Sequence, residues 1–305
     1  MKILILGLGS IAQKHINALL EIDKNIEIFA LRSSNNSKNN NRVINLYNWS
    51  GVKAHNFNFA IVSTPSFFHL ENILKLDELK IPLMIEKPIF INNDQINKFN
   101  KYNLSLNKNY VACNMRFHPL IVFLKNYLNS NYSKINEVNS YCGSFLPEWR
   151  GNKDYKNIYS SKKSLGGGVN LDLIHEPDYL IYLFDFPNSS YVFNNKFSEL
   201  NIDSYDSSNI VFKYDDFNAQ ITLNYFRKDS KRTLEIVREK DTIFVDFIKN
   251  KIVDLLSGEE LFSSSKNSLK QSYLDQMKYF LNCIKNDKTP INSVQEAVSV
   301  LKLVI

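Results

Sequence analysis

The first twelve residues, MKILILGLGSIA, constrain the fold more than any other stretch of the chain. Residues 2–6 form a short apolar run of the kind found in buried strands, and glycines follow at once in the spacing G-x-G-x-x-A. A strand, a glycine turn and a helix in this order are the setting of a dinucleotide fingerprint. Gly7 permits the tight turn, Gly9 leaves room for a pyrophosphate, and the small Ala12 lets the helix pack closely on the strand.

We expect the helix after this turn to cover residues 11–20, where apolar side chains recur at helical spacing. The free N–H groups at its start, near Ser10 and Ile11, and the positive end of the helix dipole favour phosphate binding. Taken alone, the same glycines are more typical of a plain turn. Directly behind a hydrophobic strand, they predict a cofactor loop.

Length and composition narrow the class of protein. A chain of 305 residues fits two domains. The net charge of +6 is spread along the sequence without a dense Lys/Arg block, so nucleic-acid binding is not indicated. Cys113, Cys142 and Cys283 match neither a zinc spacing nor a disulfide framework, so we expect reduced thiols, no metal and a cytoplasmic location. No stretch approaches the roughly 18 apolar residues of a membrane span, and we expect no contact with a membrane.

The end of the second expected strand, residues 26–31, bears on the choice of cofactor. An NAD-specific fold places an acidic residue there, about 20 residues beyond the glycines, to hold the ribose 2′-hydroxyl. This chain has Arg32 and Ser33 instead, which suit a 2′-phosphate, although an arginine can also be solvated at a strand end. NADP(H) is therefore favoured over NAD(H), with both retained.

The third buried strand, residues 59–63, ends in Thr64 and Pro65, and His69 follows on the next expected helix. Ligands of open α/β sheets bind at the carboxyl ends of the strands, which makes this turn a candidate part of the cofactor site. A proline near the first position of an ordinary helix explains the same residues equally well.

The next strand, residues 81–85, is closed by Glu86, Lys87 and Pro88. A lysine at the end of a buried strand is held near the ligand rim in a partly desolvated place, where its pKa can fall far enough for proton transfer. Pro88 fixes the chain just beyond it and allows a cis peptide. On these residues alone, a surface lysine in a strand-to-helix turn remains the alternative.

The second half of the chain contains successive β-rich runs with no helix between most of them, which predicts an antiparallel sheet. A helix over residues 120–129 precedes these runs, and helices over 273–284 and 294–304 follow them and could pack back on the body. The runs are near residues 138–145, 191–197, 209–214, 219–225, 234–238, 242–247 and 251–255.

Residues 146–159 form an irregular segment that contains Trp149, Arg150 and Tyr155. Aromatic faces suit the C–H surfaces of a sugar, and arginine suits hydroxyl, carboxylate or phosphate groups. A loop folded over the sheet accounts equally well for any one of these residues. Arg116, just after a further strand, joins them as a candidate substrate contact.

A glycine run at residues 166–168 leads into Asp172 and His175. If residues 169–184 form one helix, these two side chains lie three apart on one face. A histidine beside a carboxylate is a credible proton-transfer group near neutral pH, whereas a lone histidine is more often structural. Pro177 would lie inside that helix, so we expect a kink or a late helix start.

Taken together, the N-terminal GLGSIA, the Thr64-Pro65 turn, Glu86-Lys87-Pro88 and the glycine run before Asp172 resemble one family. It is the glucose–fructose oxidoreductase and inositol dehydrogenase family of NAD(P)-dependent sugar oxidoreductases. The resemblance implies an α/β protein with a Rossmann domain, here residues 1–118, and a substrate domain, residues 119–305. The second domain would hold an open, mainly antiparallel sheet that often forms the interface of a homo-oligomer.

The resemblance also implies roles for single residues. Lys87 would hydrogen-bond the reacting oxygen, His175 would transfer the proton, and Asp172 would orient or tune these groups. In the inositol dehydrogenase branch the Asp and His are four apart, with another Asp three beyond the His. Asp178 keeps the latter spacing, whereas Asp172 lies one residue nearer to His175 than in that branch.

The same resemblance extends to binding. The residues expected on the cofactor are Gly7, Gly9, Ser10, Ile11, Arg32, Ser33, Thr64, Pro65, His69, Glu86 and Lys87. Those expected on the substrate are Arg116, Trp149, Arg150, Tyr155, Asp172 and His175.

We therefore predict an oxidoreductase that moves a hydride between nicotinamide and a carbinol or carbonyl carbon of a sugar or sugar derivative. The Leu-Pro-x-Trp of residues 146–149 looks like branches found among surface-sugar biosynthesis enzymes. One alternative is an enzyme with an anchored cofactor and a net non-redox reaction, which would turn over without added cofactor. The other is a non-catalytic dinucleotide-binding protein, which would bind the cofactor tightly and turn over no sugar.

Overall fold

The computed structural model describes residues 1–32, 40–102, 104, 108–151, 154–264 and 267–305. These residues form two compact units. Unit 1 combines Met1–Asn114 with Tyr273–Ser299, and unit 2 combines Met115–Ser272 with Val300–Ile305. Each unit therefore combines one long segment with a shorter segment from the C-terminal part of the chain.

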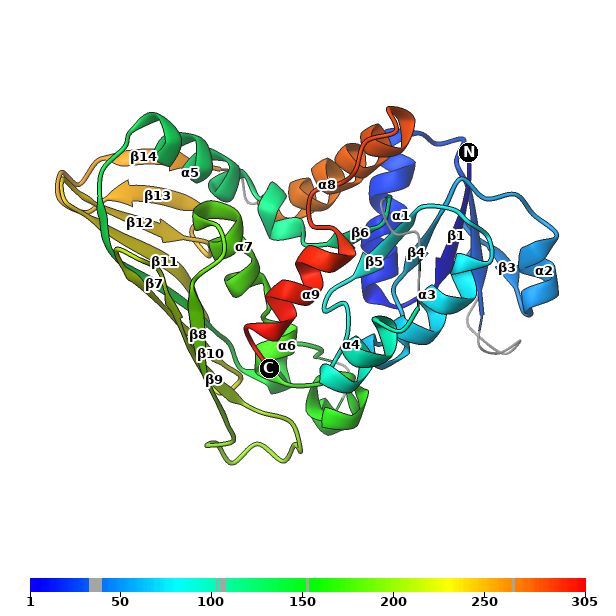
Figure 1. Cartoon of the computed structure of the whole chain (residues 1–305), viewed down its shortest axis with the longest axis horizontal. Coiled ribbons are helices and arrows are strands. Elements are labelled where there is room, and N and C mark those ends of the chain that lie inside the picture. Colours follow the sequence, from blue (N-terminus) through cyan, green and yellow to red (C-terminus); the bar gives the residue numbers. More distant parts are fainter. Residues whose placement is uncertain (33–39, 103, 105–107, 152–153, 265–266) are drawn as a thin grey trace. The chain divides into compact units, whose positions relative to one another are not determined.

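Unit 1 is built on a parallel sheet in the order β3-β2-β1-β4-β5-β6 (Figure 1). The apolar run of β1 is buried on both faces, as expected for a parallel strand that helices cover on each side. This order reverses direction between β1 and β4, the switch point at which such sheets bind ligands. The described strands are β1 (Lys2–Leu6), β2 (Glu27–Leu31), β3 (Ile44–Leu46), β4 (Phe59–Val62), β5 (Leu83–Glu86) and β6 (Tyr110–Ala112).

Helices cover both faces of this sheet. On one face the Phe280 ring of α8 packs edge-on against Phe59 of β4 at 5.3 Å, and His15 of α1 lies 5.8 Å from the Tyr273 ring. Figure 1 shows α3 and α4 along the opposite face. The helices concerned are α1 (Ser10–Ile22), α2 (Trp49–Lys53), α3 (His69–Asp77), α4 (Asn93–Phe99), α8 (Ser268–Lys285) and α9 (Val294–Lys302).

The late segment of unit 1 is tied to the edge strand β6. The Tyr110 hydroxyl donates to Gln276 Oε1 at 3.1 Å, and the Tyr110 ring stacks on Phe280 at 5.8 Å. Asn292 donates through its side chain to the Val111 carbonyl at 2.7 Å and accepts from the Val111 N–H at 3.0 Å. Residues far along the chain thus complete the core of the first sheet.

Unit 2 is built on a second sheet in the order β14-β13-β12-β11-β7-β10-β9-β8. Its neighbouring strands are antiparallel except for β7 and β10, which pair in parallel. The predicted fold class, a Rossmann domain with a second, mainly antiparallel sheet, is confirmed. The described strands are β7 (Ile135–Gly143), β8 (Ser189–Asn195), β9 (Ser207–Lys213), β10 (Asn218–Asn224), β11 (Lys231–Arg238), β12 (Thr242–Asp246), β13 (Lys251–Asp254) and β14 (Glu260–Ser263).

Helices α5 (Pro119–Ser130) and α7 (His175–Phe184) of unit 2 lie on one face of this sheet (Figure 1). Phe123 of α5 stacks on Phe262 of β14 at 4.5 Å, and Tyr179 of α7 lies 5.7 Å from the Phe247 ring. On the other face, Tyr191 of β8 is more than half exposed. Residues of one strand alternate between a covered and an open face, as the pleat requires.

The structure corrects the expected helix over residues 169–184. It divides that stretch into α6 (Val169–Asp172) and α7, with Leu173 and Ile174 between them. The late helix start that Pro177 indicated is confirmed, because the proline lies in the first turn of α7, where its missing N–H has no intrahelical partner to lose. Asp172 and His175 are therefore not on one face of a single helix.

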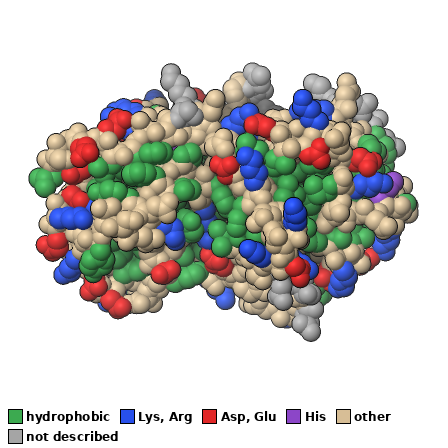
Figure 2. Space-filling view, turned by 90° about the horizontal axis from the view of Figure 1, so that it is seen from above, with side chains coloured by type: hydrophobic (Ala, Val, Ile, Leu, Met, Phe, Trp, Pro, Cys, Tyr) green, Lys and Arg blue, Asp and Glu red, His purple; other side chains and the backbone are tan. Residues whose placement is uncertain are grey.

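The surface in Figure 2 carries acidic and basic side chains interspersed, with no continuous block of one sign on the face shown. All three cysteines are buried and free. None of the helices in the described ranges combines the length and the apolar composition that a membrane span requires. The described residues also contain no cluster of His, Cys, Asp and Glu side chains that could hold a metal ion.

Candidate active site

The glycine turn of unit 1 lies directly against the end of β4. Gly7 has φ +86°, and a Cβ there would lie 2.7 Å from both the Ser63 carbonyl oxygen and the Thr64 nitrogen. The Ser63 hydroxyl donates to the Gly7 carbonyl at 2.7 Å, which fastens the turn to its neighbour. Only a glycine satisfies both the left-handed backbone and this close approach.

Gly9 plays a different part. Its backbone is extended, it precedes the first residue of α1, and a Cβ built on it would meet no atom within 4 Å. The first turn of α1 contains no acidic side chain. Open space beside a helix N-terminus without acidic side chains fits a phosphate group, as the sequence predicted.

A cavity of about 650 Å³ opens beside this turn, at the carboxyl ends of the strands. Thr64 Oγ1 on its wall accepts from Asn72 Nδ2 at 2.9 Å, and Arg32 Nη1 donates to Asn45 Oδ1 at 2.9 Å. On α3, Lys75 pairs with Glu71 at 2.6 Å. The lining residues are Leu6, Gly7, Leu8, Leu31, Arg32, Thr64, Pro65, Phe68, Glu71, Asn72 and Lys75.

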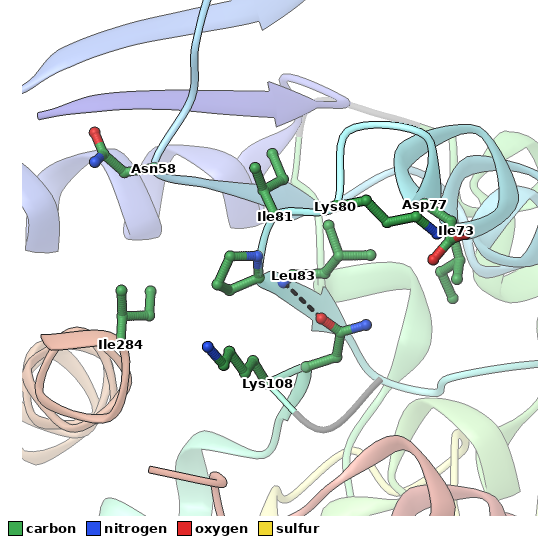
Figure 3. A pocket seen from close by; sticks show the side chains of 10 residues that line it. Asn58, Ile73, Asp77, Lys80, Ile81, Leu83, Lys108 and Ile284 are labelled. Atoms are coloured by element: carbon green, nitrogen blue, oxygen red, sulfur yellow. Dashed lines mark hydrogen bonds and ion pairs between the residues drawn. The ribbon is translucent and has the colours of Figure 1, made fainter. Parts of the chain in front are cut away.

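Another cavity of unit 1, about 370 Å³, lies at the opposite end of the same strands (Figure 3). Its wall includes Asn58, just before β4, and Pro82, just before β5. The Leu83 N–H donates to Asn109 Oδ1 there at 2.9 Å. Because open α/β sheets bind ligands at the carboxyl ends of their strands, we assign the cofactor to the larger cavity.

The larger cavity fits a nicotinamide dinucleotide in shape and charge. Gly9 leaves room at the helix start, and Arg32 and Lys75 outnumber the single acid Glu71 on the wall. Leu8, Leu31 and Phe68 add apolar surface of the kind that ligand pockets use against flat rings. When bound, a nicotinamide cofactor accepts or supplies a hydride at C4 of its ring.

The structure brings only part of the predicted cofactor set together. Gly7, Arg32, Thr64 and Pro65 share the cavity wall, and Ser10 and Ile11 begin α1 beside it. Ser33 lies outside the described residues. The sequence did not indicate the contribution of α3, whose lining side chains recur at helical spacing. They are Glu71, Asn72 and Lys75, together with Phe68 just before the helix.

Two predicted cofactor residues are buried in the protein and hydrogen-bonded there. His69 is fully buried, with its ring nitrogens 2.9 Å from the Thr64 carbonyl oxygen and 3.0 Å from that of Pro88. Burial lowers the pKa of His69, and hydrogen bonding to these carbonyls only partly opposes it. Glu86, also buried, accepts from His15 Nε2 at 2.6 Å.

Lys87 follows Glu86 directly, immediately after the end of β5, and its side chain is half-buried. The Lys87–Pro88 peptide is cis, as the sequence allowed. The neighbouring Lys14 of α1 has a lowered pKa, chiefly through burial, with Lys87 lowering it further and Glu86 opposing the change. The sensitivity of Lys14 to both charges shows that a small charged cluster surrounds the end of β5.

In unit 2, Asp172 is buried and held by two tyrosines. The Tyr159 hydroxyl donates to its Oδ1 at 2.7 Å, and the Tyr225 hydroxyl donates to its Oδ2 at 2.5 Å. Burial, followed by the nearby Asp172 charge, raises the pKa of both tyrosines. The two hydroxyls therefore remain protonated at neutral pH and act as donors to the carboxylate.

Part of the irregular segment 146–159 gathers around this carboxylate. The Trp149 ring meets Tyr225 edge-on at 5.1 Å, and its Nε1 donates to Ser144 Oγ at 2.8 Å. The Arg150 guanidinium lies over the Tyr159 ring at 5.6 Å. Tyr155 lies elsewhere, with its hydroxyl 3.4 Å from the Asn201 nitrogen.

Buried ion pairs fix the first turn of α7, on which His175 is the first residue and half-buried. Asp178 accepts two hydrogen bonds from Arg116, at 2.7 and 2.9 Å, and both side chains are 2% exposed. Glu176 accepts from Arg232 Nε at 2.6 Å. Arg116, predicted as a substrate contact, is thus engaged in the protein interior and helps to hold the helix that carries His175.

Tyr225 and Arg232 were missed because no local pattern marks them. Tyr225 is 53 residues from Asp172, and Arg232 is 56 residues from Glu176. Tyr159 belongs to the segment that the sequence singled out, but its role toward Asp172 became visible only in the structure.

Comparison with known proteins supports the fold and the class of cofactor. Residues 1–110 match the model of an oxidoreductase family with an NAD-binding Rossmann fold. A search of curated proteins finds no match.

Among solved structures, myo-inositol 2-dehydrogenase from Lactobacillus plantarum is 16% identical, with a TM-score of 0.81 over 100% of this chain and 95% of that one. The WlbA dehydrogenase from Bordetella pertussis, solved with NADH and UDP-GlcNAcA, is 16% identical, with a TM-score of 0.77 over 100% and 94%. A WlbA dehydrogenase from Chromobacterium violaceum is 18% identical, with a TM-score of 0.79 over 99% and 91%. At these identities the likeness establishes the fold.

The fold and the glycine cavity thus define an oxidoreductase with a nicotinamide-dinucleotide-binding Rossmann domain. Residues 1–110 match the model of that oxidoreductase family, and for this part of the chain the resemblance drawn from the sequence motifs is confirmed.

Replacing Gly9 by valine tests the cofactor site. The new side chain meets no protein atom, so the fold should persist, but it fills the space left for the pyrophosphate. Gly9→Val should abolish NADH and NADPH binding by fluorescence titration while the circular dichroism spectrum stays unchanged. Gly151→Val is the matched control, because that glycine also has no neighbour within 4 Å. Undiminished binding to Gly9→Val would place the cofactor elsewhere.

Proposed function

We propose that the protein transfers a hydride between NADP(H) or NAD(H) and a CH–OH or C=O carbon of a sugar derivative. The observation that carries the proposal is the position of Lys87 immediately after β5, the strand beside β4, at whose junction with β1 the glycine cavity opens. A lysine at the ligand rim is suited to hydrogen-bond the reacting oxygen. We propose residues 1–118 as the cofactor domain and 119–305 as the substrate domain, with residues 273–299 of the latter packing back on the first unit.

The proton is assigned to His175, because imidazole exchanges a proton near neutral pH. The paired acids of α7 hold this residue at the helix start. Asp172 accepts hydrogen bonds from two tyrosine hydroxyls and serves to orient or tune the site. His69 and Glu86 support the cofactor side from the interior.

The substrate proposed is an anionic sugar derivative of the kind used in surface-sugar biosynthesis. Both WlbA dehydrogenases of similar fold were solved with NADH and UDP-GlcNAcA, a sugar that carries a carboxylate. Arg150 lies over Tyr159, one hydroxyl away from Asp172, and supplies a cation for such a group. Trp149 offers an aromatic face.

Removing Lys87 should slow the reaction without loosening the cofactor. General acid–base groups contribute roughly 10²–10⁴-fold to rate, so Lys87→Ala should lower kcat with UDP-GlcNAcA and NADP⁺ by about that factor. Absorbance of the reduced cofactor measures it, with Lys53→Ala as the control because Lys53 pairs with Glu78 on the surface. Full activity in Lys87→Ala would remove its assigned role.

Arg150 should read the charge of the substrate. A charge-assisted hydrogen bond of roughly 1.5–3 kcal/mol corresponds to a KM increase of about 10- to 100-fold for Arg150→Ala with UDP-GlcNAcA. UDP-GlcNAc, which lacks the carboxylate, should lose much less, and Arg150→Lys should recover part of the effect. Equal losses on both sugars would mean that Arg150 supports the loop and reads no charge.

NADPH should bind more tightly than NADH, because Arg32 lies on the cavity wall where an NAD-specific fold has an acid. Loss of a charge-assisted contact should weaken NADPH binding to Arg32→Ala by about 10- to 100-fold and leave NADH nearly unchanged. Arg42→Ala is the control, since Arg42 is exposed and bonds to Asn17. Tighter binding of NADH, unchanged in Arg32→Ala, would defeat the preference.

We also propose that the open face of the second sheet forms a homo-oligomer. Tyr191 and Phe193 of β8 are 55% and 58% exposed, and Val211 on β9 is the register partner of Tyr191. A charge within such an apolar face is costly to bury. Light scattering should show an assembled wild type and a smaller species for Phe193→Glu, with Tyr132→Glu as control, because Tyr132 is an aromatic side chain that is 87% exposed and lies outside the sheet. A monomeric wild type would contradict the proposal.

A further inference from the structure

Two buried histidines contact the turn that carries Lys87, defined here as residues 86–88. His15 of α1 meets Glu86 on one side, and His69 of α3 meets the Pro88 carbonyl on the other. Both imidazole rings are completely buried. The two histidines therefore contact the residues on either side of the lysine proposed for catalysis.

The contact of His15 is a single, directed hydrogen bond. Its Nε2 lies 2.6 Å from Glu86 Oε1, while its Nδ1 is buried with no hydrogen-bond partner among the described residues. Because a carboxylate only accepts, Nε2 of His15 carries a proton and donates it to Glu86. The Tyr273 ring, edge-on at 5.8 Å, packs against the imidazole and holds its orientation.

His69 joins two turns of the site. One ring nitrogen lies 2.9 Å from the carbonyl oxygen of Thr64, on the cofactor cavity, and the other lies 3.0 Å from that of Pro88. A neutral imidazole has one N–H, so it donates to one carbonyl at a time. The ring nevertheless spans the gap between the cavity wall and the Lys87 turn with no room for water on its buried surface.

Glu86 is the charged residue next to Lys87 in the sequence. The orientation of its carboxylate therefore affects the electrostatic environment of the Lys87 amine. The lysine on α1, Lys14, senses both Glu86 and Lys87. The hydrogen bond from His15 holds the Glu86 carboxylate in one orientation. Released from His15, it is free to pair more closely with either amine.

We infer that His15 and His69 are positioning residues that fix the Lys87 turn, His15 through the Glu86 carboxylate and His69 through the Pro88 carbonyl. This inference rests on the proposed function only for its catalytic consequence. The geometry that it describes can be tested without a substrate.

The substrate-free test is the acetylation rate of Lys87, measured by peptide-resolved mass spectrometry with limiting acetic anhydride at pH 8. A pKa change of about half a unit alters the free-amine fraction by about threefold. His15→Leu should slow Lys87 acetylation by about threefold or more, because the freed Glu86 pairs with the ammonium group. His69→Leu should speed it by a similar factor, because the turn loses its tie to Thr64.

The conservative variants and a remote histidine provide the controls. His15→Gln retains an N–H donor toward Glu86 and should bring the Lys87 rate within about twofold of wild type. His55→Leu should not change it, since His55 packs on Phe29 and Phe57 away from this turn. Unchanged Lys87 rates in both folded leucine variants would overturn the inference.

A second variant decides the question if a leucine variant fails to fold. Glu86→Gln still accepts from His15 but removes the negative charge, so Lys87 acetylation should rise by about threefold or more. An unchanged rate would show that Glu86 does not act on Lys87.

Kinetics then separate this inference from the proposed function. His15→Leu should lower kcat by about 10- to 100-fold with little change in the dissociation constant of NADPH, and should add nothing to Lys87→Ala. An additive loss would mean that His15 acts elsewhere. Full activity of Lys87→Ala together with the expected acetylation rates would defeat the proposed function and leave the positioning role intact.

Discussion

The close approach of Gly7 to the end of β4 is the contact on which the first unit depends. With no Cβ, Gly7 rests against the Ser63 carbonyl and the Thr64 nitrogen, and Ser63 donates back to it. This contact brings the end of β1 against the end of β4, just before the chain enters α1, which packs on one face of the sheet. The cavity beside it exists because two neighbouring turns are packed without side chains between them.

Close contacts also fix the end of β5. His69 reaches from the Thr64 turn to Pro88, and His15 reaches from α1 to Glu86, so three successive strand ends are linked through hydrogen bonds. In unit 2, tyrosine hydroxyls hold Asp172 and arginines hold the acids of α7. Each candidate catalytic group thus lies on an element whose polar neighbours are themselves fixed, which is what a preorganised site requires.

Much of the first unit could be predicted because its signals are local. The KILIL run, the glycine spacing and the residues that end each strand are read within a few positions, and the sheet edge then follows from parallel topology. The antiparallel runs of the second unit were also visible from their alternation, although their ends shifted by a few residues. The short strands β3 and β14 were not predicted, since three or four residues carry little periodicity.

What could not be predicted depends on contacts between distant residues. Arg116 looks like a substrate ligand in the sequence, but a carboxylate 62 positions away engages it in the interior. Pro177 indicated the late start of α7, but the separate α6 before it, which carries Asp172 between two distant tyrosines, was not marked by any local pattern. The parallel pairing of β7 with β10 likewise joins strands that a long crossover connection separates in the sequence.

A crystal structure of the protein with NADPH bound tests the central claim most directly. The account predicts the pyrophosphate beside Gly9 at the start of α1, the 2′-phosphate next to Arg32, and the nicotinamide ring at the Lys87 turn. With a sugar also bound, the Lys87 amine should lie within about 2.6–3.2 Å of the reacting oxygen. A dinucleotide bound outside the glycine cavity, or a nicotinamide ring remote from Lys87, would contradict it.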